Sequence, residues 1–82
     1  MKADELLLVL EIRAQATNGV ARARRVASGV SVREIAGALE VYPSTVTRWE
    51  DGDVVPRASA ALRWARLLDR LESHRSGRTV SA

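Results

Sequence analysis

The chain has 82 residues, of which 28% are charged and 46% hydrophobic, and a formal net charge of +3. This length allows one domain with a small core, and the composition is too apolar for a disordered chain. Cysteine is absent and histidine occurs once, which excludes disulfides and thiolate metal sites, so we expect no metal and no cofactor. The apolar run at residues 6–10 is far shorter than the ~20 residues that span a bilayer, and acidic residues precede it where a signal peptide is positive. We therefore expect a cytoplasmic protein without membrane contact.

Two helices are predicted in the first third of the chain. Residues 3–17 contain no glycine or proline, begin with acidic residues where the helix dipole favours them, and run into Asn18-Gly19. Residues 20–27 form a short amphipathic pattern that stops at Ser28-Gly29. The spacing predicts that this second helix turns Val20, Ala23, Val26 and Ala27 inward, with Arg22, Arg24 and Arg25 largely elsewhere.

A third helix is predicted to begin after Ser31. Ser31 and Glu34 form an S-x-x-E capping box, in which each side chain accepts a hydrogen bond from the other residue's backbone N–H. The apolar residues that follow have the i, i+3, i+4, i+7 spacing of a stripe that faces a core. They are Val32, Ile35, Ala36 and Leu39. This helix is expected to end near Leu39.

A fourth helix is predicted from Pro43, because proline suits the first turn of a helix. Val46 and Trp49 face inward, whereas the opposite side is short, polar and rich in hydrogen-bonding groups. That outer side consists of Ser44, Thr47, Arg48 and Asp51. After a turn at residues 51–53, Pro56 opens a last helix over residues 58–71, and residues 73–82 are expected to be a flexible basic tail.

The charges are distributed unevenly around these elements. Residues 19–36 and 57–82 carry an excess of arginine, whereas residues 37–56 carry more acidic than basic side chains. Two helices joined by a tight connection at residues 40–42 can cross at a wide angle and present the second helix to the major groove of DNA, which admits a helix. On this interpretation positive charge flanks the reading helix instead of lying on it.

Three stretches of sequence carry a family resemblance. They are S-V-R-E-I-A at residues 31–36, L-E-V at 39–41 and S-T-V-T-R-W-E-D-G at 44–52, with Pro56 following. On these residues the chain resembles the lambda-repressor and Cro type of helix-turn-helix protein, called XRE-like, across roughly residues 20–71. The resemblance implies an all-α, compact five-helix domain. Residues 1–18 would add a helix before a DNA-binding unit at 19–72, with the tail at 73–82.

The resemblance also implies which residues contact DNA. Contacts to base edges fall on Tyr42, Pro43, Ser44, Thr47 and Arg48. Contacts to phosphates fall on Ser31, Arg33, Asp51 and Arg57. Arg48 can bind guanine through two hydrogen bonds, whereas Asp51 would have to act through backbone N–H groups because its carboxylate repels phosphate. An ion pair between Arg25 and Glu50 is implied as a structural tie between the reading helix and the scaffold.

Three residues depart from the family pattern. Val32 stands where a glutamine that anchors a phosphate is frequent, so Ser31, Arg33 or the N–H groups at the helix start must substitute for it. Glu40 stands where the turn usually has glycine, which predicts either a left-handed non-glycine residue or a different turn. Tyr42 replaces a capping serine or threonine.

The function expected from these features is sequence-specific binding of double-stranded DNA in the major groove by a transcription regulator, specifically a Cro-like repressor of the phage or mobile-element kind. No set of nucleophile, base and orienting group can be named, so we expect neither an enzyme nor a small-molecule ligand. Residues 6–10 and Ile12 cover more of the first helix than one core contact requires, which favours a homodimer on DNA or a helix wrapped on its own domain. The alternative function is an antitoxin-like interaction module that binds a protein partner through this helix.

Overall fold

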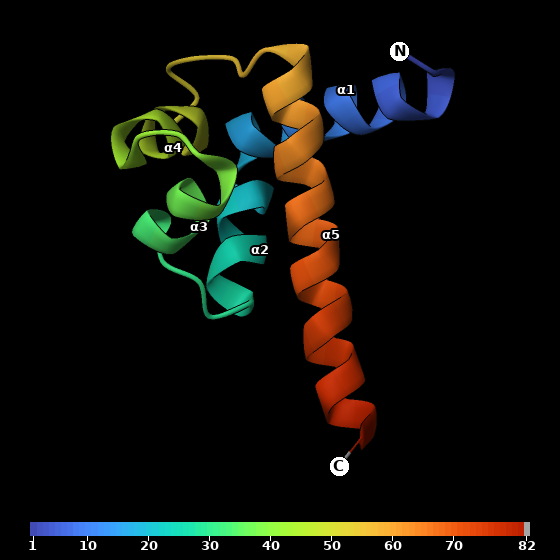
Figure 1. Ribbon diagram of the computed structural model, residues 1–82. Coiled ribbons are helices and arrows are strands. Elements are labelled where there is room, and N and C mark those ends of the chain that lie inside the picture. Colours follow the sequence, from blue (N-terminus) through green and yellow to red (C-terminus); the bar gives the residue numbers. More distant parts are fainter. Residues whose placement is uncertain (82) are drawn as a thin grey trace.

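Five helices joined by short segments build the fold. The computed structural model describes residues 1–81, with side chains as far as Ser76. The helices are α1 (Ala3–Asn18), α2 (Val20–Ala27), α3 (Val32–Leu39), α4 (Pro43–Glu50) and α5 (Ala58–Ser81). No strand occurs in residues 1–81, and the predicted all-α architecture of five helices is confirmed. In Figure 1, α1 crosses one end of the long α5, while α2, α3 and α4 gather on one side of α5.

The hydrophobic core forms where α1 crosses α5 and where the shorter helices meet them. Val9 and Ile12 of α1 belong to the same buried cluster as Trp64 and Leu68 of α5. The cluster also takes in the inward stripes predicted for α3 and α4, namely Ile35, Ala36, Leu39, Val46 and Trp49. Each large apolar side chain buried in this way contributes about 1.5–3 kcal/mol. The core therefore holds α3 and α4 against a platform made by the first and last helices.

The link between α1 and α2 requires a glycine. Gly19 has a left-handed backbone, with φ 87° and ψ −6°, which a residue without a Cβ adopts freely. The side-chain oxygen of Asn18 accepts a hydrogen bond from the N–H of Val20 at 2.9 Å. The chain thus leaves α1 one residue later than predicted and enters α2 at once.

The inward face predicted for α2 is wrong. Val20 and Val26 are 41% and 59% exposed, whereas Ala21 is fully buried and Arg25 is only 8% exposed. The helix is turned this way because Arg24 and Arg25 meet carboxylates on other helices, and a charged side chain that is paired and hydrogen-bonded can be buried. The spacing of apolar residues within this eight-residue helix carries no information about carboxylates that lie far away in the sequence.

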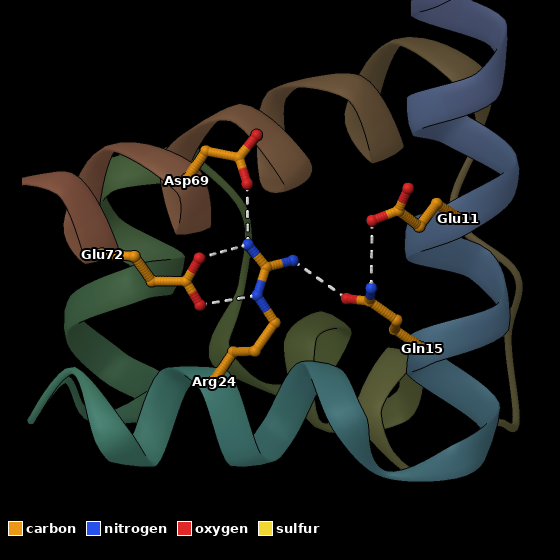
Figure 2. Close-up of polar contacts among 5 residues, drawn as sticks. All are labelled: Glu11, Gln15, Arg24, Asp69 and Glu72. Carbon is orange, nitrogen blue, oxygen red and sulfur yellow. Dashed lines mark hydrogen bonds and ion pairs between the residues drawn. The ribbon is translucent and has the colours of Figure 1, made fainter.

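Arg24 ties three helices together in the polar network shown in Figure 2. Its Nε and Nη2 atoms donate to the two carboxylate oxygens of Glu72 at 2.8 and 2.7 Å, and Nη2 also donates to Asp69 at 2.7 Å. Nη1 donates to the side-chain oxygen of Gln15 at 2.9 Å, and Gln15 donates in turn to Glu11 at 3.3 Å. The network fixes how α1, α2 and α5 meet and pairs the carboxylates of Asp69 and Glu72 with a cation.

We expect stability to fall in acid because of these hydrogen bonds. Those from Arg24 hold the pKa of Glu72 below 4.5, its ordinary value, and the capping contacts of Lys2 and Ser31 lower the pKa of Glu5 and Glu34. Since each folded-state pKa lies below the unfolded one, the contribution is complete above about pH 4.5 and is lost as the pH falls through the lower folded values. Urea unfolding followed by circular dichroism at a series of pH values measures this decline. Glu72→Gln should make it shallower, and an unchanged slope contradicts the role given to Glu72.

The predicted end of the last helix at Leu71 is also wrong, since α5 continues to Ser81. Residues 73–81 of the expected tail therefore have a helical backbone, while the side chains of residues 77–81 and all of Ala82 lie outside the described part. Arg75 holds the first added turn, because its Nη1 donates to the carbonyl oxygen of Ala27 at 2.6 Å. That carbonyl belongs to the last turn of α2, where the helix dipole favours a basic side chain.

Candidate nucleic-acid interface

The capping box fixes the start of α3. The Ser31 hydroxyl oxygen accepts a hydrogen bond from the N–H of Glu34 at 3.1 Å, and the Glu34 carboxylate accepts one from the N–H of Ser31 at 2.9 Å. The hydroxyl hydrogen of Ser31 takes no part in the box, and Arg33 is exposed two residues later. Both can therefore reach a phosphate, while the Glu34 carboxylate at the same helix end opposes an anion.

The connection from α3 to α4 turns at Glu40. This residue has left-handed backbone angles, with φ 59° and ψ 43°, so of the two conformations left open by the sequence the left-handed non-glycine residue is present. The N–H of Val41 donates to the carbonyl oxygen of Ala36 at 3.0 Å and closes the end of α3. Tyr42 then precedes α4 in an extended conformation. The turn keeps the two helices in a helix-turn-helix arrangement with strain confined to one residue.

Glu40→Gly should raise the free energy of unfolding by about 1 kcal/mol. A left-handed residue that carries a Cβ costs about 1–2 kcal/mol, and glycine removes this strain. Part of the gain in stability is lost because glycine gives the unfolded chain more conformational freedom. Urea denaturation at neutral pH measures the change. The matched control is Glu40→Ala, which removes the same charge but keeps the Cβ. An equal gain in both variants would assign the effect to charge and not to the backbone.

The inner face of α4 packs against α3, α1 and Trp64 of α5. Val46 is fully buried and Trp49 is 4% exposed. The rings of Trp49 and Trp64 lie 5.1 Å apart, centroid to centroid, with 37° between their planes. A tilted aromatic pair of this kind adds about 0.5–1.5 kcal/mol beyond the burial of its area. The direction in which α4 turns its outer face is therefore set by its packing against α3, α1 and Trp64 of α5.

A buried ion pair holds the C-terminal end of α4. Nε and Nη2 of Arg25 donate to the two carboxylate oxygens of Glu50 at 2.7 and 3.0 Å, and Nη1 donates to the carbonyl oxygen of Val30 at 2.9 Å. Only 10% of the Arg25 side chain and 4% of the Glu50 side chain are exposed. The hydrogen bonds to Glu50 raise the pKa of Arg25. This ion pair is the one that the resemblance implies, and it withdraws the Glu50 carboxylate from the surface.

The outer face of α4 and the residue before it expose polar groups to solvent. The exposed side chains are those of Tyr42, Pro43, Ser44, Thr47 and Arg48. The Thr47 hydroxyl donates to the carbonyl oxygen of Pro43 at 3.2 Å, which leaves its oxygen lone pairs for an external donor. Within the described residues, no hydrogen bond or ion pair engages the guanidinium of Arg48. All of its N–H donors are therefore available to a ligand.

Asp51 does not offer the backbone contact expected of it. Its N–H donates to the carbonyl oxygen of Thr47 at 2.9 Å, and the N–H groups of Gly52 and Asp53 donate to Trp49 and Arg48 at 3.1 and 2.9 Å. These bonds close the end of α4 in the manner of a helix C-cap. All three N–H groups thus have acceptors within the chain, and the carboxylate repels a phosphate; these features count against the phosphate contact predicted for Asp51.

The segment after α4 places Arg57 on the side of α4 that carries Thr45 and Trp49. A surface hollow of about 280 Å³ is lined by Thr45 and Trp49 of α4 together with Arg57, whose side chain is exposed. Val54 and Val55 line the same hollow and are 45% and 67% exposed. This apolar edge was not predicted from the sequence. Its signal in the sequence is the pair Val54-Val55, which stands between the turn at residues 51–53 and Pro56. The structure leaves both valines exposed in this loop.

The sites predicted from sequence thus fall on three adjoining elements. The base-reading candidates lie on and just before α4, Arg57 lies beside Thr45 and Trp49 of the same helix, and Ser31 and Arg33 stand at the start of α3, which packs on α4 (Figure 1). The part of the chain that the structure describes holds no cluster of three His, Asp or Glu side chains that could bind a metal ion. No helix within residues 1–81 is long and apolar enough to cross a membrane.

Comparison with known proteins points to one type of domain. A family model described as a helix-turn-helix domain matches residues 19–77. The match begins at residue 19, the predicted start of the DNA-binding unit, leaves out α1, and includes α2, α3, α4 and most of α5. No curated protein and no solved structure matched the chain.

Proposed function

Because the chain belongs to the helix-turn-helix domain family, whose members bind DNA, we propose that it is a sequence-specific regulator of transcription. The family match confirms the resemblance on which the expected fold was based. The observation that carries the proposal is the contrast between the two faces of α4. Its inner face is locked by Trp49 and Glu50, while its outer face holds the unengaged guanidinium of Arg48 among small hydroxyl groups.

In this proposal α4 lies in the major groove and reads base edges. The Arg48 guanidinium donates two hydrogen bonds to O6 and N7 of a guanine, the commonest specific contact between protein and DNA. Ser44 and Thr47 reach neighbouring bases or phosphates, and Tyr42 and Pro43 lie against the groove at the start of the helix. The rigid inner face supports this role, since a reading side chain discriminates best when its helix is held in place.

The phosphate contacts proposed are few. Ser31 and Arg33 would hold one strand from the start of α3, and Arg57 would hold the backbone from the segment after α4. The same surface also carries the exposed carboxylates of Glu40, Asp51 and Asp53. With few neutralised phosphates, the dependence of affinity on salt should be shallow. Binding to DNA of arbitrary sequence is then weak, and the hydrogen bonds to base edges decide where the protein binds.

The proposed mode of action is repression by occupancy, in the manner of a Cro-type protein of a phage or mobile element acting in the cytoplasm of a bacterial cell. Two copies would bind two half-sites about 34 Å apart, one helical turn of DNA, so that a single short α4 is used twice. The exposed leucines of α1 support a homodimer, because side chains of this size seldom remain in water over a whole helix face.

Selection from a library of random duplexes tests the proposed function. Immobilised full-length protein is exposed to the library at moderate salt, and the retained duplexes are sequenced over several rounds. Enrichment of one short motif that contains guanine, repeated about one helical turn apart, is the expected result. Folded protein that retains no sequence over the starting library would refute sequence-specific binding.

A further inference from the structure

Helix α1 carries apolar side chains on two faces, and only one of them meets the core. Val9 and Ile12 are buried, whereas Leu7 and Leu10 are 65% and 51% exposed. The exposed side contains Ala3, Leu7, Leu10, Ala14 and Thr17, which follow one another in alternating steps of four and three residues. This is the spacing at which one helix packs along another. These five residues are termed the α1 seam.

One flank of the α1 seam is acidic. Asp4 and Glu11 are exposed and lie seven residues apart, so both stand on the same side of the α1 seam. Within the described residues neither carboxylate is paired with a cation, and Glu11 accepts only a hydrogen bond from Gln15 at 3.3 Å. A surface that covers the α1 seam must therefore be apolar along its centre and basic along this flank.

The chain itself presents such a surface on α5. A hollow of about 250 Å³ is lined by the apolar side chains of Ala38, Leu39 and Leu67 together with Arg63, Arg66 and Arg70. Arg63 donates to the carbonyl oxygen of Leu39 at 2.7 Å, and Arg66 donates to Glu5 at 2.8 Å. Arg70 is exposed and, among the described residues, has no partner. This region, termed the α5 hollow, matches the α1 seam in both apolarity and sign of charge.

We propose that the α1 seam of one copy docks on the α5 hollow of a second copy, and that the reciprocal contact closes a dimer. This inference names the two surfaces that would form the dimer of the proposed function. It rests on that function only for the role of the dimer, which is to space two copies of α4 along DNA. Antiparallel pairing of two α1 seams with each other is disfavoured. If the helices were antiparallel, their acidic flanks would lie side by side and bring the carboxylates of Asp4 and Glu11 from both copies together. The α5 hollow supplies arginine to that flank instead.

Charge reversal in the absence of DNA tests this pairing. Sedimentation equilibrium of the full chain should show a dimer, and Arg70→Glu should weaken dimerisation at least about tenfold through like-charge repulsion. The variant with both Asp4→Lys and Glu11→Lys should be weakened similarly, and combining all three substitutions should restore the dimer. Arg22→Glu is the matched control, because Arg22 is an exposed arginine on α2, outside both surfaces, and it should leave the dimer intact. Circular dichroism verifies the fold of every variant.

Three results would overturn the proposal. They are a wild-type chain that stays monomeric at several hundred micromolar, an Arg70→Glu variant that dimerises as the wild type does, and a stronger dimer when Asp4→Asn and Glu11→Gln together neutralise the acidic flank. The last result indicates paired α1 seams, and the first leaves the α1 seam to a different protein. Binding of each variant to a duplex with a single half-site is measured in parallel. A monomer that binds one half-site overturns the pairing and leaves the proposed function standing.

Discussion

Arg25→Met should lower the free energy of unfolding by about 3–5 kcal/mol, because it leaves a buried carboxylate without its partner. Only 4% of the Glu50 side chain is exposed, so water cannot replace the two hydrogen bonds that Arg25 donates to it. Domains of this kind have total stabilities of about 5–15 kcal/mol, so the loss is a large share of the whole. Urea and thermal unfolding of the purified variant measure it.

The double variant Arg25→Met with Glu50→Leu separates the stranded charge from lost packing. It removes both ionised groups and keeps apolar volume at each position, so it should recover most of the lost stability. Both variants also lose the hydrogen bond that Arg25 donates to the carbonyl oxygen of Val30. Because this loss is the same in each, it does not contribute to the difference in stability between them. If the double variant is as unstable as the single one, the buried carboxylate is not the cause.

Arg48→Ala is expected to weaken binding to the selected duplex by about 5- to 150-fold, which corresponds to the 1–3 kcal/mol of discrimination in a bidentate contact with guanine. Binding to random duplexes should change little, because Arg48 is assigned to a base and not to a phosphate. The fold should be unaffected, since no side chain or backbone group in the described part of the chain depends on its guanidinium. Fluorescence anisotropy with both duplexes at one salt concentration measures the two losses.

Arg57→Ala is the matched control for this measurement. Arg57 is an exposed arginine beside α4 that is assigned to a phosphate, so its loss should weaken binding to both duplexes alike and make the salt dependence shallower by about one phosphate contact. Equal losses on selected and random duplexes for Arg48→Ala count against base reading by that side chain.

The part of the fold that sequence predicts best is the unit from Ser31 to Glu50. Its determinants act within a few residues of one another. The capping box joins Ser31 to Glu34, Pro43 suits a first turn, and apolar spacing places Val46 and Trp49 inward. Such local chemistry is visible in a single sequence, and the strained turn at Glu40 could also be foreseen as one of two conformations.

The features that sequence misplaces depend on distant partners. Arg25 meets Glu50 across 25 positions of sequence and Arg24 meets Glu72 across 48, and these contacts turn α2 against its own apolar spacing. The N–H of Asp51 closes the end of α4, a detail of helix ending that residue type alone does not specify. Sequence supplies the candidate residues, whereas tertiary pairing decides which of them stay free to meet DNA.

The contact between Trp49 and Trp64 gives the protein an intrinsic optical reporter. The chain has two tryptophans, and both belong to this contact between α4 and α5. Their ultraviolet emission therefore reports how α4 is seated on α5, and not an average over the molecule. A duplex that binds the outer face of α4 reaches neither buried ring. Emission that stays constant on binding identifies rigid docking, and emission that shifts identifies movement of α4 on its support.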